Sequence, residues 1–240
     1  LMKINFEDFR GFINNKTWAI EEGYLEALLA GGPVTTYAAS GPARNAGMTA
    51  VIPVSGMILH KESAFSKYIG ATTVEKMRAM ISYAVNDKQI SNIVLDVDSP
   101  GGTVDGVPEL ASEISAASKI KPITAVANTL MASAAYWLGS QANEIVASPS
   151  AQVGSIGVFT THASFSRKLA ADGIDITLIR AGKFKAESNP YETLSEDAKN
   201  NIQASIDGVY NNFINSVASG RGVSIEKAIN QFGQGRVMDS

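Results

Sequence analysis

The chain has 240 residues, of which 45% are hydrophobic and 18% are charged, and its formal net charge is −3. This composition suits a globular protein with a substantial core, and the weak negative charge gives no electrostatic footprint for nucleic acid. The lack of cysteine excludes disulfides and thiolate catalysis, and two histidines are too few for a multi-histidine metal site, so no metal or other cofactor is expected.

Residues 1–46 differ from the rest and are predicted to form an N-terminal arm. Trp18 leads into apolar residues at helical spacing, which predicts a short amphipathic helix that includes Tyr24, Leu25, Leu28 and Leu29. A Gly-Gly-Pro stop at 31–33 and a small-residue linker at 38–42 follow. Residues 47–240 are then the body of the protein.

The body alternates apolar strands with helices, which indicates an α/β protein whose sheet is covered on both faces. Strands are expected at 50–54, 92–97, 123–127, 144–146, 155–160 and 175–179, and helices at 73–84, 107–117 and 165–171. A long C-terminal helix should follow a capping box at Thr193 and Glu196 and end at Gly220 or Gly222. Its apolar stripe is interpreted as core or subunit interface.

Two consecutive glycines, Gly101 and Gly102, follow the strand at 92–97. Because glycine lacks a Cβ, a ligand can come very close to the backbone there. The glycine N–H groups would then form part of an oxyanion hole, where negative charge develops on a scissile carbonyl oxygen. An ordinary strand-to-helix turn is the alternative that this segment leaves open.

Ser133 directly follows the strand at 123–127 and opens a helix rich in small residues. The N–H groups and partial positive charge at a helix start favour an anion, and small neighbours let a substrate approach the hydroxyl. The N–H of Ala134 would complete the oxyanion hole. The competing interpretation is that Ser133 only caps its helix.

Two lysines, Lys183 and Lys185, follow the last predicted strand of the body. A lysine accepts a proton from a serine hydroxyl only when its pKa falls well below its ordinary value of about 10.4, as burial in an apolar pocket can achieve. A lysine of this kind serves as the base in serine–lysine variants of the catalytic triad. An exposed surface position is the alternative for either residue.

The order of these segments resembles the signal peptide peptidase A family of serine–lysine peptidases, from about residue 50 to residue 237. The matching motifs are Ser99-Pro100-Gly101-Gly102, Ala132-Ser133-Ala134-Ala135-Tyr136-Trp137, Gly154-Ser155-Ile156-Gly157-Val158 and Gly182-Lys183-Phe184-Lys185, and the segment 142–149 is also similar. The resemblance implies a ClpP/crotonase-like α/β fold of repeated ββα units with a long C-terminal helix.

The resemblance also implies roles for individual residues. The family's nucleophile falls on Ser133 and its general base on Lys185, or on Lys183 if the alignment slips by two positions. The serine that orients the lysine falls on Ser155. Backbone N–H groups of Gly101 or Gly102 and of Ala134 would form the oxyanion hole. An extended substrate is expected to pair with the edge near 101–104 and to form an acyl-enzyme.

The family resemblance further implies a homo-oligomer, since serine and lysine can come from neighbouring protomers in relatives of this length. No apolar run approaches the roughly 18 residues of a membrane span, so no membrane anchor is expected. The arm is similar to that of soluble phage and prophage head maturation proteases, which digest scaffold and trim capsid proteins. We therefore expect protein substrates of this kind, in the host cytoplasm or an immature capsid. The sequence stops before the family's usual Gly-Leu-Val-Asp ending, which suggests truncation or self-processing.

Four other interpretations remain open. A signal-peptide-degrading peptidase without its anchor is one, and a crotonase-type acyl-CoA hydratase or isomerase, which would need acidic catalysts, is another. A ClpP-like Ser-His-Asp peptidase would require His60 or His162 as its base. The last alternative is a catalytically idle assembly protein that has kept the fold.

Overall fold

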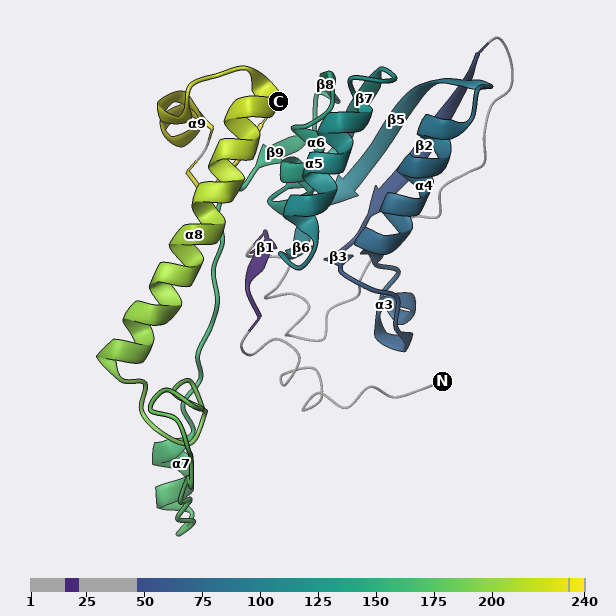
Figure 1. The fold of residues 1–240 in the computed structure, drawn as a ribbon. Helices are drawn as coiled ribbons and strands as arrows, with labels where there is room; N and C mark the ends of the chain where they lie inside the picture. The colour runs from purple at the N-terminus through teal and green to yellow at the C-terminus, as the bar shows by residue number, and fades with distance from the viewer. Residues whose placement is uncertain (1–15, 22–46, 233, 240) are drawn as a thin grey trace. The chain divides into compact units, whose positions relative to one another are not determined.

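The computed structural model describes residues 16–21, 47–232 and 234–239 (Figure 1). The chain divides into two compact units, one of residues 1–17 with 159–209 and one of residues 18–158 with 210–240. The positions of these parts relative to one another are not determined, so each unit is considered by itself. The predicted boundary between an arm and a body at residue 46 adjoins the undescribed segment 22–46 and stays a prediction.

The larger unit contains a mostly parallel sheet in the order β10-β9-β7-β5-β2. Its parallel strands are β2 (Met48–Ser55), β5 (Ile90–Ser99), β7 (Ile123–Ala132) and β9 (Gln152–Gly154), and β10 (Val237–Asp239) joins β9 in antiparallel fashion. Strand β8 (Glu144–Ala147) also pairs with β7, at the beginning of that strand, whereas β9 pairs with its end. The end of β7 therefore lies beside the end of β9.

Helices α4 (Val74–Asn86) and α5 (Val107–Ala117) lie side by side against this sheet (Figure 1). The hydroxyl of Thr73 caps α4 by accepting the N–H of Lys76 at 3.3 Å. Apolar residues at helical spacing turn inward from both helices, and they are fully or nearly fully buried: Val74, Met77, Ile81 and Ala84 in α4, and Val107, Leu110, Ala111, Ile114 and Ala117 in α5. The expected helices at 73–84 and 107–117 are thus present.

A second, smaller sheet has the order β1-β6-β3-β4. Its strands are β1 (Trp18–Ile20), β6 (Gly101–Thr103), β3 (Ile58–Leu59) and β4 (Thr72–Thr73), with helix α3 (Ala64–Tyr68) between β3 and β4. Residues 18–20 were expected to lead into a helix, but they form an antiparallel strand against β6. The remaining residues of that predicted helix lie outside the described part of the chain.

The long C-terminal helix α8 (Glu196–Arg221) is present, and α9 (Ile225–Gln231) follows it. Its first turn is capped by Ser195, whose hydroxyl accepts the N–H of Ala198 at 3.2 Å, and not by Thr193 as the sequence pattern predicted. The helix ends at Arg221 and is followed by Gly222, which takes a positive φ of 61°.

Two predicted strands are wrong. Residues 155–160 form no strand, because β9 ends at Gly154 and Ser155 takes a positive φ of 52°, which turns the chain out of the extended conformation. Residues 175–179 form no strand either, although α7 (Ser166–Ala171) precedes them as expected. Ile176 and Ile179 of this segment remain exposed, since an apolar pattern alone does not supply the hydrogen-bonding partner that a strand needs.

Candidate active site

Ser133 lies in a sharp turn between β7 and the short helix α6 (Ala134–Gly139). Its backbone has φ 54° and ψ −120°, a conformation that costs a residue with a Cβ of order 1–3 kcal/mol. Hydrogen bonds hold the turn on both sides: the Ser133 N–H donates to Gly154 O at 2.8 Å, and Ser133 O accepts the N–H of Trp137 at 2.8 Å. A strained strand-to-helix turn of this kind also holds the nucleophile of α/β-hydrolases.

The Ser133 side chain is fully buried, and its Oγ has no hydrogen-bond partner among the described residues. It does not cap α6, so the capping interpretation of the sequence is wrong. An unpaired buried hydroxyl costs about 1–3 kcal/mol relative to a paired one. The Ser133 hydroxyl therefore does not stabilise the strained turn in which it lies, and its oxygen is available for chemistry.

Gly101 brings the backbone of β6 directly against Ser133. A Cβ built on Gly101, whose φ is +95°, would lie 2.8 Å from Ala134 N and 2.9 Å from Ser133 Cβ, so no side chain fits there. The hydroxyl of the buried Ser99 accepts the Gly101 N–H at 3.2 Å and donates to Gly56 O at 2.7 Å. The Gly101 N–H is thus held by an internal side chain, whereas Gly102 pairs with β1 at the edge of β6, so the geometry favours Gly102 over Gly101 as the candidate oxyanion donor beside Ala134.

Ser155 lies beside Ser133 because the ends of β7 and β9 are paired, with Ala132 opposite Gly154. Its N–H donates to Arg236 O at 2.8 Å, and the residue is nearly buried. The motif Gly154-Ser155 therefore lies next to the candidate nucleophile. Ser133, Ser155, Gly101, Gly102 and Ala134 are brought together in one unit, although they span more than fifty positions of the sequence.

Lys185 belongs to the other unit, so no distance to Ser133 follows from the structure. It lies in the irregular turn 181–188, where its side chain is exposed and its N–H donates to Gly182 O at 3.1 Å. The Nζ of the alternative base, Lys183, lies 4.8 Å from the centre of the Phe184 ring. Within its own unit Lys185 therefore lacks the buried environment expected for the base, and its role stays a prediction.

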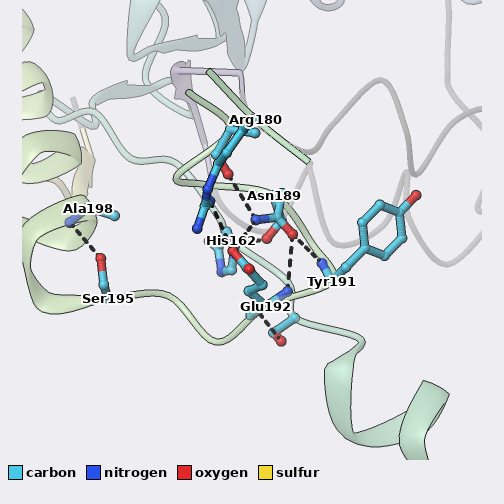
Figure 2. Close-up of polar contacts among 9 residues, drawn as sticks. His162, Arg180, Asn189, Tyr191, Glu192, Ser195 and Ala198 are labelled. Carbon is cyan, nitrogen blue, oxygen red and sulfur yellow. Dashed lines mark hydrogen bonds and ion pairs between the residues drawn. The ribbon is translucent and has the colours of Figure 1, made fainter. Parts of the chain in front are cut away.

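A polar network holds the segment that follows the lysines (Figure 2). Asn189 lies at its centre: its side-chain oxygen accepts the N–H groups of Tyr191 and Glu192 at 2.8 and 3.1 Å. Its amide donates to Glu192 Oε2 at 2.9 Å and to Ala186 O at 2.8 Å, next to Lys185. Arg180 adds an ion pair to Glu192 at 3.2 Å. The turn that carries Lys185 is therefore anchored at its C-terminal side.

Neither histidine is hydrogen-bonded to Ser133, whose Oγ has no partner within the described residues. Nε2 of His162 lies 3.1 Å from Asn189 O in the other unit. Nδ1 of His60 is buried, close to Gly106. The described residues include no group of three or more His, Asp or Glu side chains placed as metal ligands.

Helix α8 packs against α6 through contacts that the sequence did not predict. The rings of Trp137 and Phe213 stack with centroids 4.4 Å apart, and Gln141 Nε2 donates to Ser216 O at 3.0 Å. Both rings are fully buried. Burial raises the pKa of the neighbouring Tyr136, an effect that the charge of Arg221 partly opposes. The aromatic spacing along α8 was the only signal of this support in the sequence.

No helix in the described part of the chain is both long and apolar enough to span a membrane. A family model described as Peptidase family S49 matches residues 115–239. Capsid assembly protease C of Escherichia phage lambda is 34% identical over 177 residues, which are 74% of this chain and 40% of that protein. Protease 4 of Salmonella typhi is 33% identical over 202 residues, which are 84% of this chain and 32% of that protein. The chain thus spans less than half the length of these two relatives.

A solved structure of a mutant 1510-N membrane-bound stomatin-specific protease aligns with 82% of this chain and 74% of that chain, with a TM-score of 0.47 and 14% identity. The S49 match covers more than half of the sequence and includes Ser133, Ser155 and Lys185. It confirms the family resemblance and the ClpP/crotonase-like α/β fold that the resemblance implied. The chain belongs to peptidase family S49.

Proposed function

We propose that this protein is a serine endopeptidase that uses Ser133 as its nucleophile and Lys185 as its general base. The observation that carries the proposal is the state of Ser133: a buried hydroxyl without a described partner, in a strained turn, with the N–H of Ala134 and the glycines of β6 beside it. These groups supply the nucleophile and the oxyanion donors that acyl transfer requires, and the general base is the remaining component of the site.

The reaction proceeds through an acyl-enzyme. Neutral Lys185 takes the hydroxyl proton as Ser133 Oγ bonds to the scissile carbonyl carbon, and the N–H groups of Gly102 and Ala134 stabilise the resulting oxyanion. The carbon–nitrogen bond breaks, and the lysine proton passes to the leaving amine. The same lysine then deprotonates a water molecule that attacks the ester carbon, the bond from that carbon to Ser133 Oγ breaks, and the lysine proton returns to Oγ as the acyl group leaves as a carboxylic acid. Ser155 orients the lysine.

Lys185 is exposed in the described chain, so the proposed base needs an apolar environment that is supplied when the site is assembled. Burial against the apolar surroundings of Ser133 would disfavour the charged ammonium and produce a neutral base. Homo-oligomerisation, with serine and lysine supplied by different protomers, is one way to achieve this. Activity would then depend on assembly.

The primary test is Ser133→Ala, with labelling by a fluorophosphonate probe and hydrolysis of casein as readouts. Wild-type protein should be labelled on the peptide that contains Ser133, and the variant should lose both labelling and hydrolysis, by at least a thousandfold for hydrolysis. An idle assembly protein would show neither activity in the wild type. Full activity of Ser133→Ala would end the proposal.

Lys185→Ala and Lys183→Ala form a matched pair for the base. Lys185→Ala should lose hydrolysis nearly as completely as Ser133→Ala, whereas Lys183→Ala should keep most of it. The reverse result would assign the base to Lys183. Mixing inactive Ser133→Ala with inactive Lys185→Ala locates the dyad: recovered activity means that serine and lysine come from different protomers.

For the biological substrate we propose capsid or scaffold proteins of a phage or prophage, in the host cytoplasm or an immature capsid. The similarity to a capsid assembly protease of phage lambda supports this choice. The similarity to Protease 4 keeps a signal-peptide-degrading role as the alternative. Incubation with phage capsid and scaffold proteins, and separately with synthetic signal peptides, distinguishes the two by which substrate is cut.

A further inference from the structure

We infer that Trp18–Ile20 is bound as a substrate strand and that the Ala19–Ile20 peptide bond is a self-cleavage site. This inference rests on the proposed function and adds a specific bond to it. An extended substrate is expected to pair with the edge of β6 near residues 101–104. Strand β3 pairs with one edge at Gly102, and β1 occupies the other in antiparallel fashion.

The register of β1 places one carbonyl at the candidate oxyanion donor. Trp18, Ala19 and Ile20 lie opposite Thr103, Gly102 and Gly101, and the Glu21 N–H donates to Pro100 O at 2.6 Å. Hydrogen-bonded pairs alternate along an antiparallel ladder, so the next bonded pair is Ala19 with Gly102. The Gly102 N–H, which we propose as an oxyanion donor, is therefore directed at the Ala19 carbonyl.

The same carbonyl also lies close to the nucleophile. Ala19 O, Ala134 N and Ser133 Cβ all lie within 3 Å of the single point where a Cβ on Gly101 would stand, at 2.2, 2.8 and 2.9 Å. The Ala19 carbonyl is thus a neighbour of both proposed oxyanion donors and of the residue that attacks. In a substrate, this position belongs to the scissile carbonyl.

The side chains of β1 fit a bound strand, not a strand lying loosely on the surface. Trp18 and Ala19 are fully buried and Ile20 is 3% exposed. A small residue is expected at position 19, since Ala19 is fully buried and a larger side chain there would have to displace its packed neighbours. Deep burial on both sides holds the intervening bond in place beside Ser133.

The step balances as an ordinary acyl transfer. Ser133 Oγ bonds to the Ala19 carbonyl carbon as its proton passes to Lys185, the bond from that carbon to Ile20 N breaks, and the lysine proton completes the new amine of Ile20. Water then hydrolyses the ester, which leaves a free carboxylate on Ala19. The products are a fragment that ends at Ala19 and a chain that begins with Ile20.

Intact-mass spectrometry and N-terminal sequencing of the full chain test the inference, with fluorophosphonate labelling of the same samples. Wild-type protein should accumulate a chain that begins with Ile20, and Ser133→Ala should accumulate none. Ala19→Ser, which stays small, should be cut like the wild type, whereas Ala19→Phe should be cut at least tenfold more slowly. A synthetic peptide covering residues 16–23 provides a second measurement that needs no folded variant, and wild-type protein should cut it between Ala19 and Ile20.

The two proposals fail in different ways. If the wild type is labelled at Ser133 and hydrolyses casein, yet leaves this bond intact in both the chain and the peptide, the self-cleavage site is refuted and the peptidase stands. Equal cutting of Ala19→Phe and Ala19→Ser would also refute the requirement for a small residue. A wild type without labelling or hydrolysis refutes the proposed function, and the inference falls with it.

Discussion

Two glycines of α8 should respond in opposite directions to the same substitution by alanine. Gly208 and Gly220 both lie within the helix. A Cβ on Gly208 would meet nothing within 4 Å, whereas a Cβ on Gly220 would lie 2.2 Å from Ser140 O and 2.9 Å from Gln141 Nε2. Ser140 directly follows α6, whose first residue follows Ser133. The comparison therefore measures how closely α8 supports the helix of the candidate nucleophile.

The magnitudes follow from helix propensity and packing. Alanine is favoured over glycine in a helix interior by about 0.8–1.0 kcal/mol, so Gly208→Ala should stabilise the protein by about that amount. At Gly220 the same gain is opposed by overpacking against a backbone oxygen, which costs about 1–3 kcal/mol and occasionally more. The 2.2 Å contact is with a backbone oxygen, which can move less than a side chain can. We therefore expect Gly220→Ala to lower the free energy of unfolding by about 1–2 kcal/mol.

Thermal unfolding followed by circular dichroism is the appropriate assay, since a change of 1 kcal/mol shifts Tm by about 2–4 °C in a chain of this size. Gly208→Ala should raise Tm, and Gly220→Ala should lower it. Casein hydrolysis below both transitions should fall only in Gly220→Ala, because a displaced α8 also displaces α6. If Gly220→Ala stabilises the protein as much as Gly208→Ala, α8 does not pack against Ser140 and the argument for its supporting role is wrong.

Two further predictions concern buried groups next to the site. Ser99→Ala removes the hydroxyl that links Gly56 O to the Gly101 N–H, so the free energy of unfolding should fall by about 1–3 kcal/mol. At temperatures where the variant stays folded, kcat should decrease by a larger factor than the factor by which KM changes. A rise in KM with kcat unchanged would show that Ser99 does not position β6 for the reaction. Burial raises the pKa of Tyr136, so the unfolded chain loses the phenolic proton first and stability should decline as pH rises above about 10 towards the folded pKa. Tyr136→Phe should flatten this alkaline decline in urea unfolding experiments, and an unchanged slope would contradict the burial argument.

Much of the larger unit could be predicted from local pattern. The helix at 107–117 has Pro108 in its first turn and apolar residues at helical spacing, and the structure gives the same bounds. The strand beginning at Ile123 is an apolar run introduced by Lys121-Pro122, and it is present, although it extends further, to Ala132. The grouping of Gly101, Gly102 and Ser133 in one site was implied only by the family resemblance, and it agrees with the rule that the carboxyl ends of neighbouring parallel strands meet at one edge.

Other features depend on partners far away in the sequence. Trp18–Ile20 is a strand because β6, more than eighty residues later, offers it a free edge, and three residues carry no strand periodicity of their own. The end of β9 depends on the backbone conformation of Ser155, which no hydrophobic pattern reveals. The pairing of Lys185 with Ser133 requires the placement of one compact unit against another, within or between chains, and stays a prediction.

The backbone at Ser133 and Ser155 has a consequence for how this protein can diverge. Both residues hold positive φ angles, 54° and 52°, which glycine adopts freely and serine does not. Replacement of either serine by glycine would therefore relieve local strain as it removed the hydroxyl. Under the roles proposed for these two hydroxyls, a variant that loses the reaction would gain stability, so activity and local backbone stability oppose each other at both positions.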